Sequence, residues 1–170
     1  MFMVDVAENW QSEFLQFSLF IFATIWLVQR GSPESKEIGD EGPESDRKQL
    51  VGRYAPPGAP SWARAGGWRT TVYSNSLLIV MTGIFLASWL AQSLAGTVVA
   101  NDEAAQHGQP PITWIGYVAS SDFWNRTLQN WQSEFLAVGA MVTFAIVLRQ
   151  RGSAESKPVG APHSDTASTG

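Results

Sequence analysis

The 170-residue chain has no cysteine and only two histidines, His107 and His163. Without cysteine it can form neither a disulfide nor a thiolate metal site, and neither histidine has further ligands at metal-binding spacing. The sequence also has no phosphate-binding glycine loop, nucleophile elbow or paired acid–base constellation. These absences predict a protein without catalytic residues, metal or cofactor, and we do not expect an enzyme.

What the chain does contain is an internal repeat. The seven residues Asn9–Leu15 (NWQSEFL) return unchanged as Asn130–Leu136, at an offset of 121 residues. The same offset continues to a second signature, in which Gln29–Lys36 matches Gln150–Lys157 except for Pro33 against Ala154. Self-similarity of this kind indicates that one structural unit was duplicated.

Three apolar stretches, at about 14–28, 77–100 and 135–148, have the texture of membrane spans. A bilayer crossing needs about 20 apolar residues, and only the middle stretch is long enough alone. The outer two reach that length only if the Asn-Trp-Gln-Ser-Glu turns before them are part of the crossing. This gives spans of about 10–28, 76–100 and 130–149. We therefore expect an all-α integral membrane protein with three transmembrane helices.

Two alternatives to membrane spans fit less well. Buried helices of a soluble bundle would carry a polar face, whereas the middle stretch is apolar around most of its circumference. A cleavable signal peptide would have a basic start, whereas Asp5, Glu8 and Glu13 precede or open the first stretch.

Lysine and arginine are scarce outside two segments. Seven of the 11 lie between Arg30 and Arg69, three follow the third stretch from Arg149 to Lys157, and Arg126 is the remaining one. Basic residues are retained on the cytoplasmic side of a membrane. The 31–74 loop and the C-terminus should therefore be cytoplasmic, with the N-terminus and residues 101–126 outside.

The repeat also divides the chain. Residues 1–36 form a partial first repeat, and residues 71–157 form a second repeat with an interfacial segment at 112–121. Between them lies a polar, Gly- and Pro-rich loop at 37–70, and a small polar tail at 158–170 ends the chain; both are expected to be disordered. This amounts to one and a half copies of a two-span unit. Either the partner helix was lost or, as we favour, the native start lies upstream of Met1.

Small residues recur every four positions in the middle span. They are Gly83, Ala87, Ala91 and Ala95. A ridge of small side chains lets a second helix approach closely in lipid, where no hydrophobic force drives association. The spacing predicts a helix-packing face.

The repeated signature supplies the candidate polar site. Asn9 and Glu13 are four residues apart and share one helix face, as do Asn130 and Glu134. Carboxylates at a membrane boundary are costly and are functional candidates by default. The four residues could bind a cation or pass a proton, or they could fix how the helices pack. We favour packing, because Gln16 and Thr24 in the first copy correspond to Ala137 and Ala145 in the second.

The paired signatures, together with Ser121-Asp122-Phe123, resemble a family of small bacterial multi-pass membrane proteins catalogued only as a domain of unknown function. The resemblance covers nearly the whole chain. It implies four spans in family members, so this chain departs by one span. It also implies a place in the bacterial inner membrane, and it assigns no activity or catalytic residue.

The expected function is assembly in the lipid bilayer, with a second copy of the chain or another membrane protein and without nucleic acid. Two alternatives stay open. One is a proton- or cation-linked channel or transporter that uses Glu13 and Glu134. The other is a membrane anchor whose cytoplasmic loop recruits partners.

Overall fold

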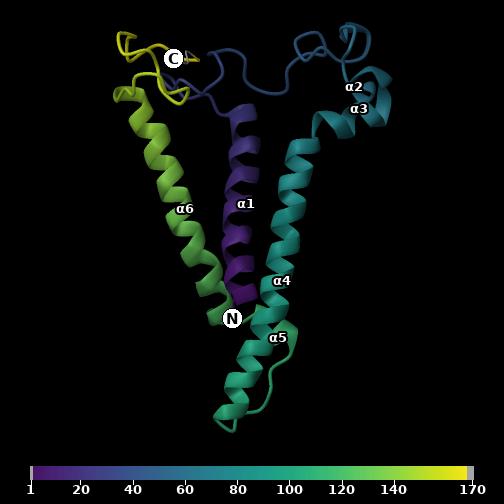
Figure 1. Ribbon diagram of the computed structural model, residues 1–170, viewed down its shortest axis with the longest axis vertical. Helices are drawn as coiled ribbons and strands as arrows, with labels where there is room; N and C mark the ends of the chain where they lie inside the picture. Colours follow the sequence, from purple (N-terminus) through teal and green to yellow (C-terminus); the bar gives the residue numbers. More distant parts are fainter. Residues whose placement is uncertain (1, 168–170) are drawn as a thin grey trace. The chain divides into compact units, whose positions relative to one another are not determined.

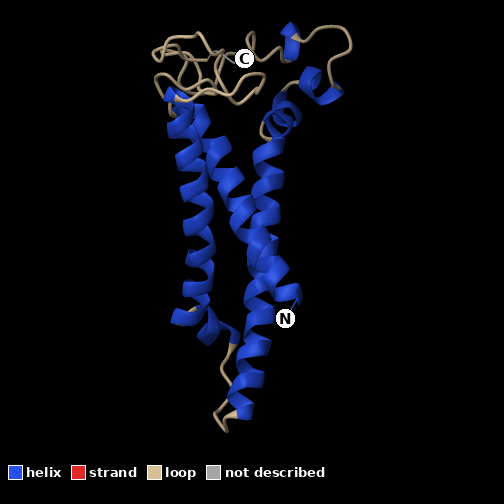
Figure 2. Cartoon of the chain, turned by 60° about the vertical axis from the view of Figure 1, so that its left-hand side comes forward, coloured by secondary structure: helices blue, strands red, loops and turns tan. Residues whose placement is uncertain are grey.

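The computed structural model describes residues 2–167, and within them it contains helices and loops without a strand (Figures 1 and 2). The predicted all-α class is confirmed. The three long helices are α1 (Phe2–Trp26), α4 (Ser76–Gln106) and α6 (Ser121–Val147). The short ones are the 3-10 helix η1 (Gly52–Tyr54), α2 (Ser61–Ala65), α3 (Gly67–Ser74) and α5 (Trp114–Val118).

Only α4, among the residues described, is long and apolar enough to cross a membrane by length and composition. Helices α1 and α6 have 25 and 27 residues. Most of their apolar residues follow the repeated signature. A membrane-spanning length of either helix therefore includes the strongly polar Asn, Gln and Glu of that signature, which lower its mean hydropathy. The coarser result is therefore one candidate membrane helix in an all-α chain.

The chain divides into two compact units. Unit 1 comprises Met1–Ser18 and Val80–Ala137, and unit 2 comprises Leu19–Ile79 and Val138–Gly170. Each long helix contributes residues to both. The candidate polar residues and the small-residue stripe lie in unit 1, whereas the loop and the C-terminal tail lie in unit 2.

Unit 1 has a small aromatic core where α5 meets α4 and α6. Phe123 is fully buried, and its ring lies 5.4 Å from that of Trp89 and 5.6 Å from that of Tyr117. Gly96 makes room for Tyr117, because a Cβ built there would lie 2.6 Å from the phenol carbons. The Ser120 side chain caps α6 by accepting a hydrogen bond from Phe123 N at 3.3 Å.

Unit 2 contains the second signature twice, with the same turn each time. The backbone N–H of Gln29 donates to Ser35 Oγ at 2.8 Å, and that of Gln150 donates to Ser156 Oγ at 2.9 Å. Both turns follow directly after a long helix, α1 or α6. The two copies of the second signature therefore share this hydrogen bond.

The loop and the tail of unit 2 contain turns that are held by hydrogen bonds. Lys157 is buried, and its Nζ donates to the carbonyl of Gly31 at 2.7 Å and to that of His163 at 2.9 Å. The N–H of Gly31 in turn donates to Thr166 Oγ1 at 2.9 Å. Within the loop, η1, α2 and the start of α3 fall inside the 37–70 segment. The expected disorder of the loop and the tail stays a prediction, and its last three positions, 168–170, lie outside the described residues.

Candidate functional site

The four polar residues singled out in the sequence differ in exposure between the two copies of the signature. Asn9 and Glu13 are exposed on α1, and Asn130 and Glu134 are half-buried on α6. The described part of the chain has no hydrogen bond or ion pair joining the first pair to the second. Each copy instead makes the same local bond, from Ser12 Oγ to Asn9 O and from Ser133 Oγ to Asn130 O. A shared ion site for these four residues stays a prediction.

The buried face of α1 carries two other residues of the same signature, Gln11 and Ser12, together with Ala7 and Ser18 from outside it. Ala7, Gln11 and Ser18 recur at helical spacing, and all three are buried, as is Ser12. Gln11 has no exposed surface at all. A residue advances 100° around an α-helix, so Gln11 lies on roughly the opposite side of α1 from Asn9 and Glu13.

Gln11 connects the two copies of the signature. Trp131 Nε1 donates a hydrogen bond to Gln11 Oε1 at 2.9 Å. The reciprocal pair, Trp10 with Gln132, is not formed, since Trp10 is 52% exposed and Gln132 is also exposed. Identical sequences therefore occupy different environments, and the contact between them is asymmetric.

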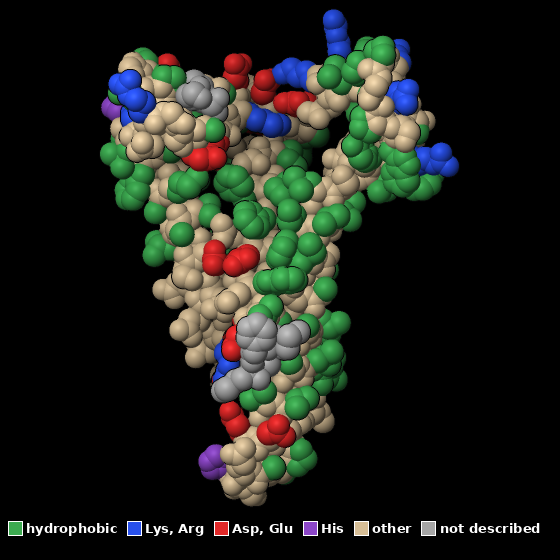
Figure 3. All heavy atoms as spheres, viewed as in Figure 1, with side chains coloured by type: hydrophobic (Ala, Val, Ile, Leu, Met, Phe, Trp, Pro, Cys, Tyr) green, Lys and Arg blue, Asp and Glu red, His purple; other side chains and the backbone are tan. Residues whose placement is uncertain are grey.

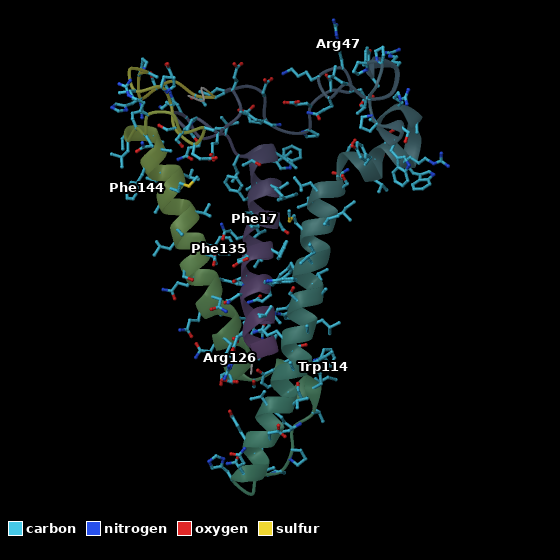
Figure 4. The ribbon with its side chains drawn as sticks, viewed as in Figure 1. Phe17, Arg47, Trp114, Arg126, Phe135 and Phe144 are labelled. Carbon is cyan, nitrogen blue, oxygen red and sulfur yellow. The ribbon has the colours of Figure 1, made fainter. Side chains whose placement is uncertain are left out.

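A carboxylate that the sequence argument passed over lies next to this contact on α1. The Glu8 side chain is only 13% exposed. Its Oε1 accepts a hydrogen bond from Gln92 Nε2 at 3.4 Å and lies 3.9 Å from Arg126 Nη1. Arg126 also donates to Asp122 from its Nε at 3.3 Å, one helical turn earlier on α6. Three helices thus meet through one charged network; Figure 4 labels Arg126 near the start of α6.

Burial and charge act in opposite directions on Glu8. Loss of hydration raises the pKa of its carboxyl, and the nearby Arg126 cation lowers it, with Asp5 adding a smaller upward effect. The net result is a pKa above the usual value of 4.5. Glu8 precedes the predicted span at about 10–28, so it stands at the start of the apolar part of α1.

Three buried polar atoms of this region have no hydrogen-bond partner in the described structure. They are Gln11 Nε2, Gln92 Oε1 and Thr127 Oγ1. Gln92 is 1% exposed and Thr127 has no exposed surface. Each unpartnered buried polar group costs about 1–3 kcal/mol of folding free energy. These three atoms therefore leave unit 1 with hydrogen-bonding groups in its interior that a further partner could satisfy. We call Glu8, Gln11, Gln92, Arg126, Thr127 and Trp131 the polar cluster.

The polar cluster combines one carboxylate and one guanidinium with neutral polar side chains. Among residues 2–167 no three His, Cys, Asp or Glu side chains come close enough to hold a metal ion. What the cluster can do is join helices through hydrogen bonds, exchange a proton at Glu8, or hold a small polar molecule at its unpartnered atoms.

The comparison with protein families gives one match. The family described as "Domain of unknown function (DUF6766)" matches residues 1–168. The chain belongs to this family. No curated protein and no solved structure matches the chain. Membership of DUF6766 carries no activity.

The small-residue stripe of this DUF6766 chain lies outside the buried face of α4. Gly83, Ala87 and Ala91 are exposed, Ala95 is half-buried, and a Cβ added at Gly83 would have no neighbour within 4 Å. The residues of α4 buried in unit 1 are Ser88, Gln92, Ser93 and Gly96. Packing of the stripe against another helix stays a prediction, and within unit 1 α4 uses a neighbouring face.

Sequence reasoning missed the polar cluster of the DUF6766 chain for a physical reason. Glu8 stands outside the repeated signature, and Gln92 is accompanied only by serine and threonine in an otherwise apolar stretch. A signal was nevertheless present, because a glutamine in the middle of a long apolar helix is expected to find an interhelical partner. Ser93 in the same stretch also has a partner from another helix, since Trp114 Nε1 donates to Ser93 Oγ at 3.0 Å.

Proposed function

We propose that the protein is an integral membrane protein with three spans, at about 10–28, 76–100 and 130–149, and that it acts through helix assembly. One observation carries the proposal: outside the small aromatic core of unit 1, most of its buried side chains are polar, whereas several of its leucines are exposed. Gln11, Gln92 and Thr127 have at most 1% of their surface exposed. By contrast, Leu86, Leu90 and Leu94, on the α4 helix that carries Gln92, are 53%, 47% and 51% exposed.

This distribution is the reverse of that in soluble proteins, where leucine is buried and glutamine is mostly exposed. Lipid tails are as apolar as leucine, so exposed leucine costs nothing in a bilayer, whereas polar side chains gain by bonding between helices. Green hydrophobic side chains along the part of α4 in unit 1 are visible in Figure 3. Phe17 on α1 and Phe135 on α6, labelled in Figure 4, are likewise 47% and 38% exposed.

The first test is extraction of the full chain from bacterial membranes with alkaline carbonate. An embedded protein stays in the membrane pellet, whereas a peripheral protein is released. Release of the chain into the supernatant, with a known multi-pass protein retained in the same pellet, would overturn the proposal.

The orientation can be tested with single cysteines, because the chain has none of its own. Ala105→Cys lies in the 101–126 segment, and Ala154→Cys lies between the third span and the C-terminal tail; both positions are exposed. A membrane-impermeant maleimide applied from outside should label Ala105→Cys in intact spheroplasts. It should label Ala154→Cys only after permeabilisation, and the opposite pattern contradicts the proposed topology.

A second candidate function, proton- or cation-linked transport, is favoured by one observation. Glu8 is a carboxylate held where three helices meet, and buried polar atoms without partners lie in the same unit. Glu8 therefore joins the predicted Glu13 and Glu134 as a candidate carrier. The test compares proton flux into proteoliposomes for the wild type, Glu8→Gln, and Glu13→Gln/Glu134→Gln at equal insertion. No flux from a well-inserted wild type would leave assembly as the proposed role.

A further inference from the structure

A second surface, formed by α2 and α3 in unit 2, has a composition unlike the rest of the chain. No aspartate or glutamate occurs between Asp46 and Asp102. The basic residues of this interval are Arg47, Lys48, Arg53, Arg64 and Arg69. The acidic residues of the loop all lie earlier, from Glu34 to Asp46, so the loop is divided into an acidic part and a basic part.

Aromatic side chains are interleaved with the later arginines. Trp62 is 41% exposed, Trp68 is 66% exposed and Tyr73 is 42% exposed. Arg64 and Arg69 are exposed beside them, and neither forms an ion pair within residues 2–167. We call Trp62, Arg64, Trp68, Arg69 and Tyr73 the α2–α3 patch; Figure 3 shows its arginine and hydrophobic side chains together over these two helices.

The α2–α3 patch is held together by its own contacts. The Trp62 and Trp68 rings pack edge to face, with centroids 5.7 Å apart, and Thr70 Oγ1 donates to Trp62 O at 2.7 Å. The Arg69 guanidinium lies 5.7 Å from the Trp68 ring centroid. Two large aromatic residues are thus fixed in exposed positions next to two cations, an arrangement that water does not favour.

A membrane surface satisfies both kinds of side chain at once. Tryptophan and tyrosine are enriched at the level of lipid headgroups, where one part of the ring is apolar and another part is hydrated. Arginine beside them is attracted by anionic headgroups, and the cytoplasmic leaflet is the anionic one. The predicted topology places the loop on that side.

We propose that the α2–α3 patch docks onto anionic phospholipid headgroups of the cytoplasmic leaflet. The occupant is a bilayer surface, because the patch presents exposed aromatic rings beside its charges, and free phosphate would use only the charges. The proposal rests on the proposed membrane location, and it adds that the bilayer must carry negative charge for this segment to bind.

The basic residues before the patch provide a matched control. Lys48 Nζ lies 2.7 Å from Asp40 Oδ1, so its charge is partly neutralised within the loop. Arg47, which follows Asp46 in the sequence, points away from the loop in Figure 4. Replacing Arg47 and Lys48 removes the same net charge as replacing Arg64 and Arg69, without touching the patch.

The experiment places one environment-sensitive fluorophore on Ala65→Cys, an exposed position at the end of α2. The full chain is reconstituted in vesicles of phosphatidylcholine alone or of phosphatidylcholine with phosphatidylglycerol. We expect a blue-shifted emission and quenching by brominated lipid only in the anionic vesicles, and both should weaken in high salt.

Arg64→Gln/Arg69→Gln should lower the ratio of docked to undocked probe by about 30-fold, since each basic residue near an anionic surface contributes a factor of about 5. Arg47→Gln/Lys48→Gln should change the ratio by less than about 5-fold. Equal emission in the two kinds of vesicle, or equal effects of the two double variants, would overturn the proposal.

A competing occupant is the acidic part of the loop itself. If Glu37→Gln/Glu41→Gln abolishes the probe shift, the patch binds its own chain, and the lipid proposal is wrong. Carbonate extraction of the same labelled protein reports embedding separately. A chain that stays embedded but shows no charge-dependent shift therefore contradicts only the docking of the patch.

Discussion

Trp131 donates its indole N–H to Gln11 Oε1 across 2.9 Å, and the two residues come from the two copies of one seven-residue sequence. The duplicated segments are therefore in direct contact, through different members of the repeat. The bond matters because Gln11 is fully buried and its Nε2 has no partner in the described structure. Without Trp131 the whole amide group would be unsatisfied.

Trp131→Phe should lower the free energy of unfolding by about 1–3 kcal/mol, the cost of a buried polar group without a partner. The measurement is equilibrium unfolding of the full chain in mixed micelles. Trp10→Phe is the matched control, since Trp10 holds the equivalent repeat position but is exposed; it should stay within about 0.5 kcal/mol of the wild type. The double variant Trp131→Phe/Gln11→Leu should recover most of the loss, because replacing both partners by apolar groups is nearly neutral. No recovery would place the cost in ring packing.

Glu8 should make stability depend on pH. Its pKa in the folded chain is raised above 4.5, chiefly by burial. The folded state therefore binds more protons than the unfolded state in the window just above 4.5, and the free energy of unfolding falls as pH rises through that window. Glu8→Gln should remove this slope. Arg126→Gln should extend the slope to higher pH, because it removes the cation that lowers the pKa of Glu8.

The measurement for Glu8 is the unfolding free energy in detergent micelles at a series of pH values between about 4 and 7, where carboxyl groups with raised pKa titrate. Glu13→Gln is the control, since the Glu13 side chain is exposed, and it should retain the wild-type slope. If the slope survives in Glu8→Gln but disappears in Glu13→Gln, then Glu8 is not the group responsible for the pH dependence.

The sequence predicts much of the local structure and less of the polar cluster. The helical class and the duplicated turns at Gln29 and Gln150 depend on nearby residues, so they follow from local patterns. The burial of Gln11 depends on where α4 and α6 lie, and no local pattern contains that information. The repeat itself shows this limit, because Gln11 is buried and its copy Gln132 is exposed.

The same argument applies to α4. Its small residues at four-residue spacing are conspicuous in the sequence, yet the face buried in unit 1 carries Ser88, Gln92 and Gly96. In a helix that is apolar around most of its circumference, periodicity cannot select the contacting face. In the proposed membrane location a few polar residues select the face instead, because lipid offers them no other partner.

Gly96 and Gly83, both on α4, should respond oppositely to alanine. A Cβ at Gly96 would lie 2.6 Å from Tyr117 Cε1, so the buried ring must move away from Phe123. Gly96→Ala should therefore lower the unfolding free energy by about 1–3 kcal/mol, as overpacking does. Gly83→Ala, with open space around it, should be neutral or stabilising by up to about 1 kcal/mol, since alanine is the better helix former.

Gly83 also tests the predicted packing stripe. Gly83→Leu adds its side chain on an exposed face of α4, where an added Cβ meets no atom within 4 Å outside the helix's own backbone. If the stripe packs against another chain, Gly83→Leu should shift the oligomer to smaller species in analytical ultracentrifugation. An unchanged oligomer distribution would remove the stripe from the list of packing faces.

Lys157 should control the order of the C-terminal tail. Its buried ammonium donates to the carbonyl oxygens of Gly31, Pro162, His163 and Asp165. Lys157→Met leaves these carbonyls without their donor, so hydrogen exchange at residues 158–167 should speed up by at least about tenfold; one charge-assisted hydrogen bond contributes about 1.5–3 kcal/mol, and 1.4 kcal/mol is a factor of ten. Lys36→Met is the control, since the equivalent Lys36 donates to Gly42 O within its own loop, and it should leave the tail unchanged. Mass-spectrometric exchange of the full chain separates the two regions. Rapid exchange of residues 158–167 already in the wild type would instead support the disorder predicted from the tail's composition, and would show that Lys157 does not hold it.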